Sequence, residues 1–115
     1  MKILLVLCHP RRDSLSGNVA DAFAKGALEA GHKIDFLDLY GEKFNPVLKV
    51  PDEPNDGKLE NYSKEVQEGF IRLNNNEAVV MVFPLWWWSM PAMLKGWIDR
   101  VWNYGLTYGP CQHNI

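Results

Sequence analysis

The feature that most constrains this chain is a short uncharged run, Val79 to Phe83, in which β-branched residues predominate. A continuous apolar run of this length is typical of a strand that is covered on both faces, as strands are inside parallel sheets. Pro84 follows directly, and because proline has no backbone N–H, the strand is predicted to end there. The run therefore predicts a sheet with helices on both of its faces.

Two further strands and three amphipathic helices are predicted along the chain. Ile3–Cys8 is another continuous apolar run and is predicted to be the central strand, whereas Lys33–Leu39 alternates only in part and is expected at an edge. The first helix is expected to end at about Ala30, the second to run from about Ser63 to Asn74, and the third to run from Met90 to Tyr104. Their apolar stripes are Val19, Phe23 and Ala27, then Tyr62, Val66, Phe70 and Leu73, then Met90, Met93, Leu94, Trp97, Ile98 and Val101.

Strands and helices alternate along the chain, and crossovers between parallel strands are right-handed. The predicted fold is therefore α/β, a doubly wound parallel sheet in a single domain over residues 1–115. The segment Tyr40–Lys58 holds three prolines and is expected to be an irregular surface loop. Its acidic residues Asp52, Glu53 and Asp56 are expected to be solvated, and Arg100 lies off the apolar stripe of the third helix.

Composition excludes several classes of function. A net charge of −2 gives no basic surface for nucleic acid or an anionic membrane. No apolar run approaches the roughly 20 residues that span a bilayer, and Met1-Lys2 leads directly into a strand, so no transmembrane segment or secretory signal is expected. Cys8 and Cys111 are too few for a disulfide framework and have no metal-ligand spacing nearby. A reducing, cytoplasmic location is the expectation, with no metal site.

The loop after the first strand is predicted to bind an anion. It is polar, carries hydroxyls at Ser14 and Ser16, and leads into a helix. Free N–H groups and the helix dipole favour negative charge at that point, and Arg11 and Arg12 could add positive charge. The simpler interpretation is that one serine only caps the helix, although two hydroxyls allow both roles. There is no GxGxxG or Walker A pattern, so a dinucleotide site of the usual Rossmann kind is not expected.

Three adjacent tryptophans, Trp86 to Trp88, follow the third strand. Consecutive loop residues cannot all point into one core, so at least one ring is expected to face solvent, a ligand or another chain. Any one tryptophan could simply cap a hydrophobic core, but three together favour a surface that binds a planar ligand or a partner. In open α/β sheets ligands bind past the carboxyl ends of the strands, where the order of the strands reverses. That position brings this loop beside the serine loop, and a ligand with a phosphate and a flat ring system, such as a flavin nucleotide, fits both.

Two segments carry a family resemblance: HPRRDSLSGNVADAF near the start and FPLWWWSMPAMLKGWIDRVWNYGLTYG near the end. The sequence resembles the NAD(P)H quinone oxidoreductases, a flavodoxin-like family that includes drug-activity modulators and ancillary proteins of potassium-efflux systems. The resemblance implies FMN or FAD as cofactor and NAD(P)H as electron donor. It assigns the phosphates to His9, Ser14, Leu15 and Ser16, and the flavin ring to Pro84, Leu85, Trp86, Trp87 and Trp88. It places Trp87, Trp88 and Tyr108 against the substrate.

The resemblance implies two-electron, ping-pong hydride transfer from NAD(P)H to a quinone or similar acceptor, with no catalytic side chain because the flavin carries the chemistry. A regulatory or interaction subunit that keeps the fold is the alternative, and a flavodoxin-type electron carrier is disfavoured by the charge of only −2. The family has five strands, so a flavodoxin-like sheet truncated after its third strand and helix is expected here. An uncovered third strand predicts a homodimer, with Trp86–Trp88 and the following helix at or near the interface.

Overall fold

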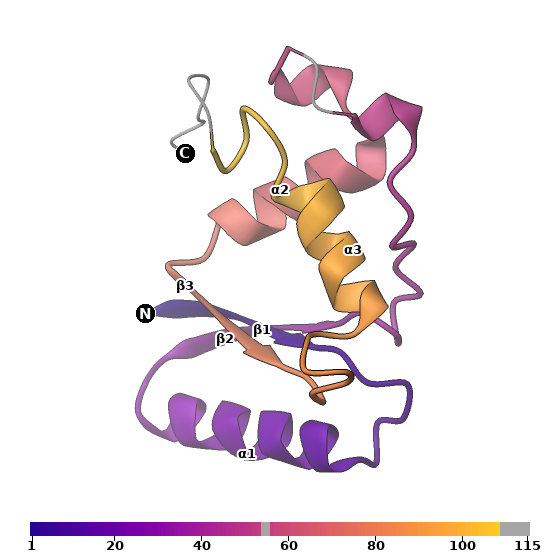
Figure 1. The fold of residues 1–115 in the computed structure, drawn as a ribbon. Coiled ribbons are helices and arrows are strands. Elements are labelled where there is room, and N and C mark those ends of the chain that lie inside the picture. The colour runs from indigo at the N-terminus through magenta and orange to yellow at the C-terminus, as the bar shows by residue number, and fades with distance from the viewer. Residues whose placement is uncertain (54–55, 109–115) are drawn as a thin grey trace.

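The computed structural model describes residues 1–53 and 56–108 of the 115-residue chain (Figure 1). The strands are β1 (Lys2–Leu7), β2 (Lys33–Asp38) and β3 (Ala78–Val82), and the helices are α1 (Leu15–Glu29), α2 (Lys64–Asn74) and α3 (Ala92–Val101). Two short 3-10 turns, Val50–Asp52 and Leu59–Asn61, lie between β2 and α2. The predicted elements are confirmed, although α3 is shorter than the predicted Met90–Tyr104 because Pro91 is its N-cap and Trp102 its C-cap. The tail from Cys111 lies outside the described residues.

The three strands form one parallel sheet in the order β2-β1-β3. β1 is central: Leu4 is opposite Asp35 of β2 on one side and opposite Val79 of β3 on the other. All residues of β1 after Lys2 are buried, as a strand paired on both edges requires. This order confirms the predicted doubly wound α/β fold.

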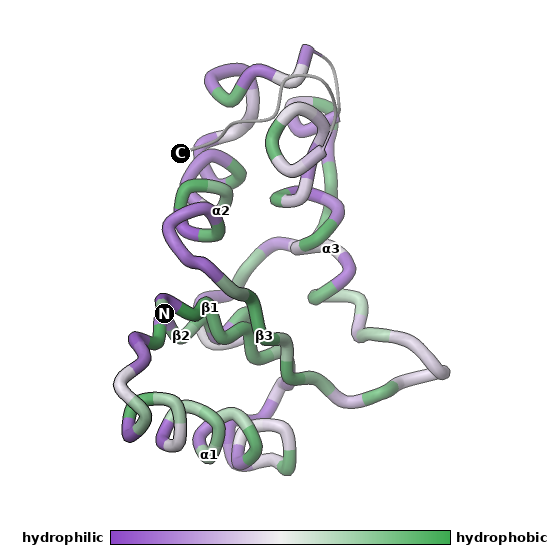
Figure 2. The backbone as a smooth tube through the Cα atoms, turned by 90° about the vertical axis from the view of Figure 1, so that its left-hand side faces the viewer, coloured by the Kyte–Doolittle hydropathy of each residue, from purple (hydrophilic) through white to green (hydrophobic). Residues whose placement is uncertain are grey.

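Helices cover both faces of the sheet, with α1 on one face and α2 and α3 on the other (Figure 1). The hydropathy of the chain follows the same layering, because the three strands form an apolar centre between helices of mixed polarity (Figure 2). Alternate β1 side chains divide between the two cores: Leu5 and Leu7 pack on the α1 side, and Leu4 and Val6 pack on the other.

The face of α1 that packs on the sheet is made of small residues. Ser16, Gly17 and Ala20 are buried in α1. Val19 and Phe23 of the predicted apolar stripe are 47% and 36% exposed instead. A face of glycine, serine and alanine lets the helix lie close to the sheet, so the bulkier stripe is rotated toward solvent.

The third strand is less covered than its sequence predicts. All five residues of β3 are half-buried, and within the described part of the chain β3 pairs with β1 alone. The prediction of burial on both faces is therefore wrong in degree. An edge strand shares only one side with the sheet, so its outer backbone and part of each side chain stay accessible.

A buried ion pair joins the long loop before α2 to helix α3. Asp52 and Arg100 are 2% and 5% exposed, and the Arg100 guanidinium donates to Asp52 Oδ2 from Nε at 3.1 Å and from Nη2 at 2.8 Å. Arg100 also donates to the Asn45 carbonyl at 2.6 Å and is paired with Glu65. The expectation that Asp52 is solvated is wrong, because these contacts hold the loop against α3.

Pro46 of the same loop lies directly against the backbone of α3 at Gly96. A Cβ at Gly96 would lie 2.3 Å from both the carbonyl oxygen and the Cβ of Pro46. Only glycine fits at that contact, which accounts for Gly96 in the LKGW segment.

None of the helices that the structure describes is both long enough and apolar enough to cross a bilayer.

Candidate functional site

A cleft of about 540 Å³ opens at the carboxyl ends of β1 and β3. It is lined by His9, Arg11, Ser14, Leu15, Ser16, Val19, Val82, Phe83, Pro84 and Leu85. The loop after β1 and the loop after β3 thus meet at the point where the order of the strands reverses, as predicted. The cleft unites all four residues predicted to bind phosphate with Pro84 and Leu85 of the predicted ring surface.

The two serines of the β1 loop have different roles. Ser14 is the N-cap of α1: its Oγ accepts from Gly17 N at 3.1 Å and donates to the Arg11 carbonyl at 2.8 Å. Since its hydroxyl hydrogen is already used, Ser14 has none to donate to a phosphate. No protein group among the described residues bonds the Ser16 hydroxyl, although Ser16 is only 8% exposed. Of the two hydroxyls, that of Ser16 is available to an anion.

The helix N-terminus supplies the other donors. Gly17 N and Asn18 N are already bonded to Ser14, to its Oγ and its carbonyl oxygen. The N–H groups of Leu15 and Ser16 belong to the first turn, where no intrahelical acceptor exists. Together with the dipole of a 15-residue helix they form an anion site that faces the cleft.

His9 and Arg11 complete the polar side of the cleft. His9 Nδ1 lies 2.9 Å from the Arg11 backbone nitrogen and 3.1 Å from the Arg11 carbonyl oxygen. In the tautomer in which Nδ1 accepts from the Arg11 N–H, Nε2 carries the hydrogen and can donate it. Arg11 brings a guanidinium to the lining. Arg12 does not, because it donates to Asp21 Oδ1 at 2.7 Å and lies over the Phe36 ring. The cleft can therefore hold a phosphate with one cation and several neutral donors.

The tryptophan loop is a two-residue hairpin. Trp86 and Ser89 form an antiparallel bridge with hydrogen bonds of 3.0 and 3.1 Å. Trp87 and Trp88 between them have φ angles of +52° and +62°, the positive values of a type I′ turn, where Asn-Gly is the usual sequence. Their rings are 95% and 90% exposed, which confirms that part of this aromatic cluster faces solvent. In Figure 2 the loop between β3 and α3 projects away from the rest of the chain.

The residues predicted to contact the flavin ring or the substrate therefore do not form one surface. Trp86 lies beside the cleft, with its ring centroid 6.1 Å from that of His9. Trp87 and Trp88 are not among the residues that line it. Tyr108 lies elsewhere: its ring packs on Tyr104 at 5.7 Å, and the segment after α3 lies at the far end of α3 from the tryptophan loop (Figure 1).

Cys8 directly follows β1, next to His9 of the cleft, but is not a nucleophile. It is fully buried, and burial raises the pKa of its thiol to about 11. The thiol is therefore protonated at neutral pH. Among the described residues no three histidine, cysteine or acidic side chains converge as metal ligands.

Three apolar residues of the cleft were not among the predicted site residues. Val82 ends β3, Phe83 directly follows it, and Val19 lies one turn after Leu15 on α1. Helical spacing could have identified Val19, because residues four apart lie on the same helix face. No sequence signal distinguishes which residues at the end of β3 face the cleft.

A parallel sheet with an anion-binding loop after β1 and an apolar loop after β3, meeting where strand order reverses, defines a flavodoxin-like α/β protein. The profile of the flavodoxin-like fold family matches residues 1–114, and the chain belongs to this family. An uncharacterized NAD(P)H oxidoreductase of Escherichia coli, YcaK, is 50% identical over 94% of this chain and 56% of its own length.

Two further relatives are named for an activity. NAD(P)H dehydrogenase (quinone) 1 of Rattus norvegicus is 31% identical over 93% of this chain and 45% of its own length. The solved structure of the NAD(P)H:quinone oxidoreductase from Methanothermobacter marburgensis has a TM-score of 0.84 and 35% identity over 94% of this chain and 56% of that one. This chain spans about half the length of the relatives it matches.

Proposed function

We propose that this chain is the cofactor-binding part of a flavin-dependent oxidoreductase that passes electrons from NAD(P)H to a quinone or a similar acceptor. The observation that carries the proposal is the cleft, in which the anion site at the start of α1 lies beside the apolar loop after β3. Its volume of about 540 Å³ is within the range of small-molecule sites. The relatives named as quinone oxidoreductases support the same assignment.

The residues of the cleft fit a flavin nucleotide, FMN or FAD. The phosphate would be held by the N–H groups of Leu15 and Ser16, the Ser16 hydroxyl and His9 Nε2, while Ser14 shapes the loop as the helix cap. Pro84, Leu85 and Trp86 would lie along the ring system, and Trp87 and Trp88 beside the acceptor. A bound flavin supplies the hydride chemistry, as two half-reactions in a ping-pong cycle.

The chain's own side chains would bind, orient and exclude water. Pro84 and Leu85 offer an apolar wall, and an apolar wall strengthens polar contacts by keeping water from them. The protonated Cys8 thiol takes no part. No nucleophile or general base is required of this chain, and the buried strand β1 with its neighbour β3 serves to fix the two loops.

We further propose that the working form is a homodimer. Helix α3 has 10 residues, and at 1.5 Å per residue about 15 Å of helix separates the tryptophan loop from the segment that carries Tyr108. A Tyr108 that contacts the acceptor would therefore come from a second copy. The exposed side chains of Trp87 and Trp88 are a surface that such a copy could cover. The cytoplasm, where Cys8 stays reduced, is the proposed location.

A non-catalytic interaction subunit is the second candidate, and the exposure of Trp87 and Trp88 away from the cleft favours it. The flavin content of the purified protein separates the two. A catalytic chain binds flavin and is bleached by NAD(P)H, whereas a pure interaction subunit does neither.

The two serines provide the sharper test of the cleft. Ser16→Ala should weaken flavin binding by about 10- to 100-fold, because a hydrogen bond to a charged group contributes about 1.5–3 kcal/mol. The same variant should unfold at nearly the wild-type urea concentration. Ser14→Ala removes the helix cap and should cost about 1 kcal/mol of stability. Flavin fluorescence titration and urea denaturation measure the two effects. An unchanged flavin dissociation constant in Ser16→Ala would refute the assignment of the phosphate to this loop.

A further inference from the structure

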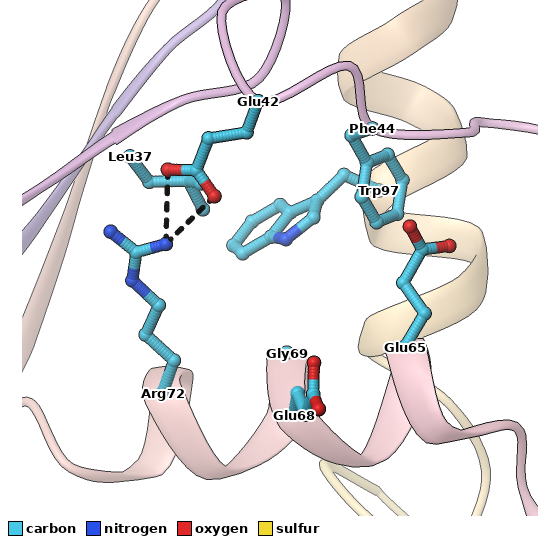
Figure 3. A pocket seen from close by; sticks show the side chains of 8 residues that line it. All are labelled: Leu37, Glu42, Phe44, Glu65, Glu68, Gly69, Arg72 and Trp97. Atoms are coloured by element: carbon cyan, nitrogen blue, oxygen red, sulfur yellow. Dashed lines mark hydrogen bonds and ion pairs between the residues drawn. The ribbon is translucent and has the colours of Figure 1, made fainter.

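The charged side chains around a second cavity already form ion pairs (Figure 3). This cavity, of about 200 Å³, lies on the α2 and α3 side of the sheet. Its ion pairs are Arg72 with Asp35 and Glu42, Glu65 with Arg100, and Glu68 with Lys64. The cleft at the carboxyl ends of β1 and β3 differs, because the Arg11 guanidinium and the Ser16 hydroxyl that line it have no partner within the described residues. The residues that orient these cleft groups therefore affect how a ligand is bound.

Arg12, the neighbour of Arg11, is held outside the cleft by contacts with two different elements. Its Nη2 donates to Asp21 Oδ1 at 2.7 Å, and its Nη1 donates to Asp21 Oδ2 at 3.3 Å. The guanidinium carbon lies 4.8 Å from the centre of the Phe36 ring. A two-toothed contact between arginine and a carboxylate has a defined geometry. One side chain thus ties the loop after β1 both to α1 and to β2.

Arg12 also closes the segment that carries the anion site. A Cβ at Gly17 would lie 2.0 Å from the Arg12 carbonyl oxygen, so the two backbones are in close contact. Arg12 Nη1 is 3.4 Å from the Gly17 carbonyl oxygen. Leu15 and Ser16 lie between these two points, and Ser16 is only 8% exposed. Because Arg12 holds the start of the segment against its end, it determines where the N–H groups and the hydroxyl of the site point.

The ion pair between Arg12 and Asp21 is too exposed to have stability as its main effect. The two side chains are 46% and 59% exposed. Ion pairs in solvent contribute little to folding, because water and salt screen them. Loss of the pair should therefore leave the protein folded and release the loop beside the cleft.

We propose that Arg12 is a positioning residue for the phosphate of the cofactor. It acts through the loop, by keeping the donors of Leu15 and Ser16 directed at the phosphate, and it does not contact the phosphate itself. This inference rests on the proposed function, because the phosphate is that of the flavin nucleotide. Arg11 is the arginine whose charge faces the cleft.

The Asp21→Asn variant distinguishes position from charge by the sign of its effect. If Arg12 acted only through its positive charge, removal of the Asp21 carboxylate would unmask that charge and tighten FMN binding. If Arg12 acts through its position, the same variant should weaken FMN binding by about two- to fivefold, the range for loss of an exposed ion pair. Asp21→Glu keeps a carboxylate and should restore much of the affinity. Glu29→Gln removes the same charge at the other end of α1 and should have no effect.

FMN and riboflavin are titrated into each purified variant, with flavin fluorescence as the readout and urea denaturation as the check on folding. Riboflavin has the same ring system and no phosphate, so every variant should bind it as the wild type does. Asp21→Asn that binds FMN as tightly as the wild type or more tightly, or that weakens riboflavin equally, would overturn the role of Arg12 alone. A wild-type protein that binds neither flavin would refute the proposed function and this inference with it.

Discussion

The tryptophan hairpin holds two large residues in a left-handed backbone conformation, although neither side chain is buried against the described residues. Trp87 and Trp88 have φ angles of +52° and +62°, and their rings are 95% and 90% exposed. Strain of this kind is found where a segment serves a function rather than stability. Replacing the pair with the residues that the turn prefers, Trp87→Asn together with Trp88→Gly, should therefore stabilise the protein.

The structure sets the size of this effect. A left-handed conformation costs a residue with a side chain about 1–2 kcal/mol, so two in succession cost about 2–4 kcal/mol. The new glycine loses more backbone entropy on folding, which removes about 0.5–1 kcal/mol of the gain. Since both rings are almost fully exposed, their removal sacrifices little buried apolar area. The free energy of unfolding of the double variant should rise by about 1–3 kcal/mol.

Urea denaturation at low protein concentration measures this change. Lys43→Gly is the matched control, because Lys43 is exposed and has a φ of +55° but carries no aromatic ring. It should gain about 1 kcal/mol or less. A double variant that is less stable than wild type at every protein concentration would refute the strain argument. A loss that grows with protein concentration would show that a second copy buries the rings.

Two further predictions concern the contacts of the long loop with α3. Burial raises the pKa of Asp52, but hydrogen bonds from Ser63 and Arg100 outweigh it, and the net pKa is lowered. Its stabilisation is therefore present above the unfolded pKa of about 3.9 and lost as pH falls through the lower folded value. Urea denaturation across pH should show a loss of stability in acid, and Asp52→Asn should reduce that loss without removing it, because the Arg72 hydrogen bond also lowers the pKa of Asp35. Gly96→Ala should lower the thermal midpoint measurably, because its Cβ would lie 2.3 Å from Pro46.

The layout of the fold followed from local pattern. The apolar runs before His9 and before Pro84 located β1 and β3, and helical spacing located α2 and α3, because each signal depends on neighbours in the sequence. The salt bridge between Asp52 and Arg100 could not be found in this way, since its partners are 48 residues apart. A helical wheel shows only that a polar residue lies off the apolar stripe, and it does not show whether a distant partner buries that residue.

The position of the candidate site could be predicted from the sequence, but the roles of its individual residues could not. Topology alone placed the loop after β1 beside the loop after β3. The difference between Ser14 and Ser16 was not predictable, because it depends on which hydroxyl the helix start uses as its cap. The turn at Trp87 and Trp88 could not be predicted either, because the sequence typical of a type I′ hairpin is Asn-Gly and not Trp-Trp.

Two unfavourable features of the described chain lie next to each other. The uncovered edge of β3 and the strained hairpin are joined by Phe83, Pro84 and Leu85, which are also the apolar wall of the cleft. A surface that covered the edge of β3 would therefore also reach the exposed indoles and deepen the cleft. Such a surface would offset the exposed strand edge, bury the rings whose strain is otherwise uncompensated, and exclude water from the cleft. Flavin affinity that rises with protein concentration would be the expected sign that a second copy supplies this surface.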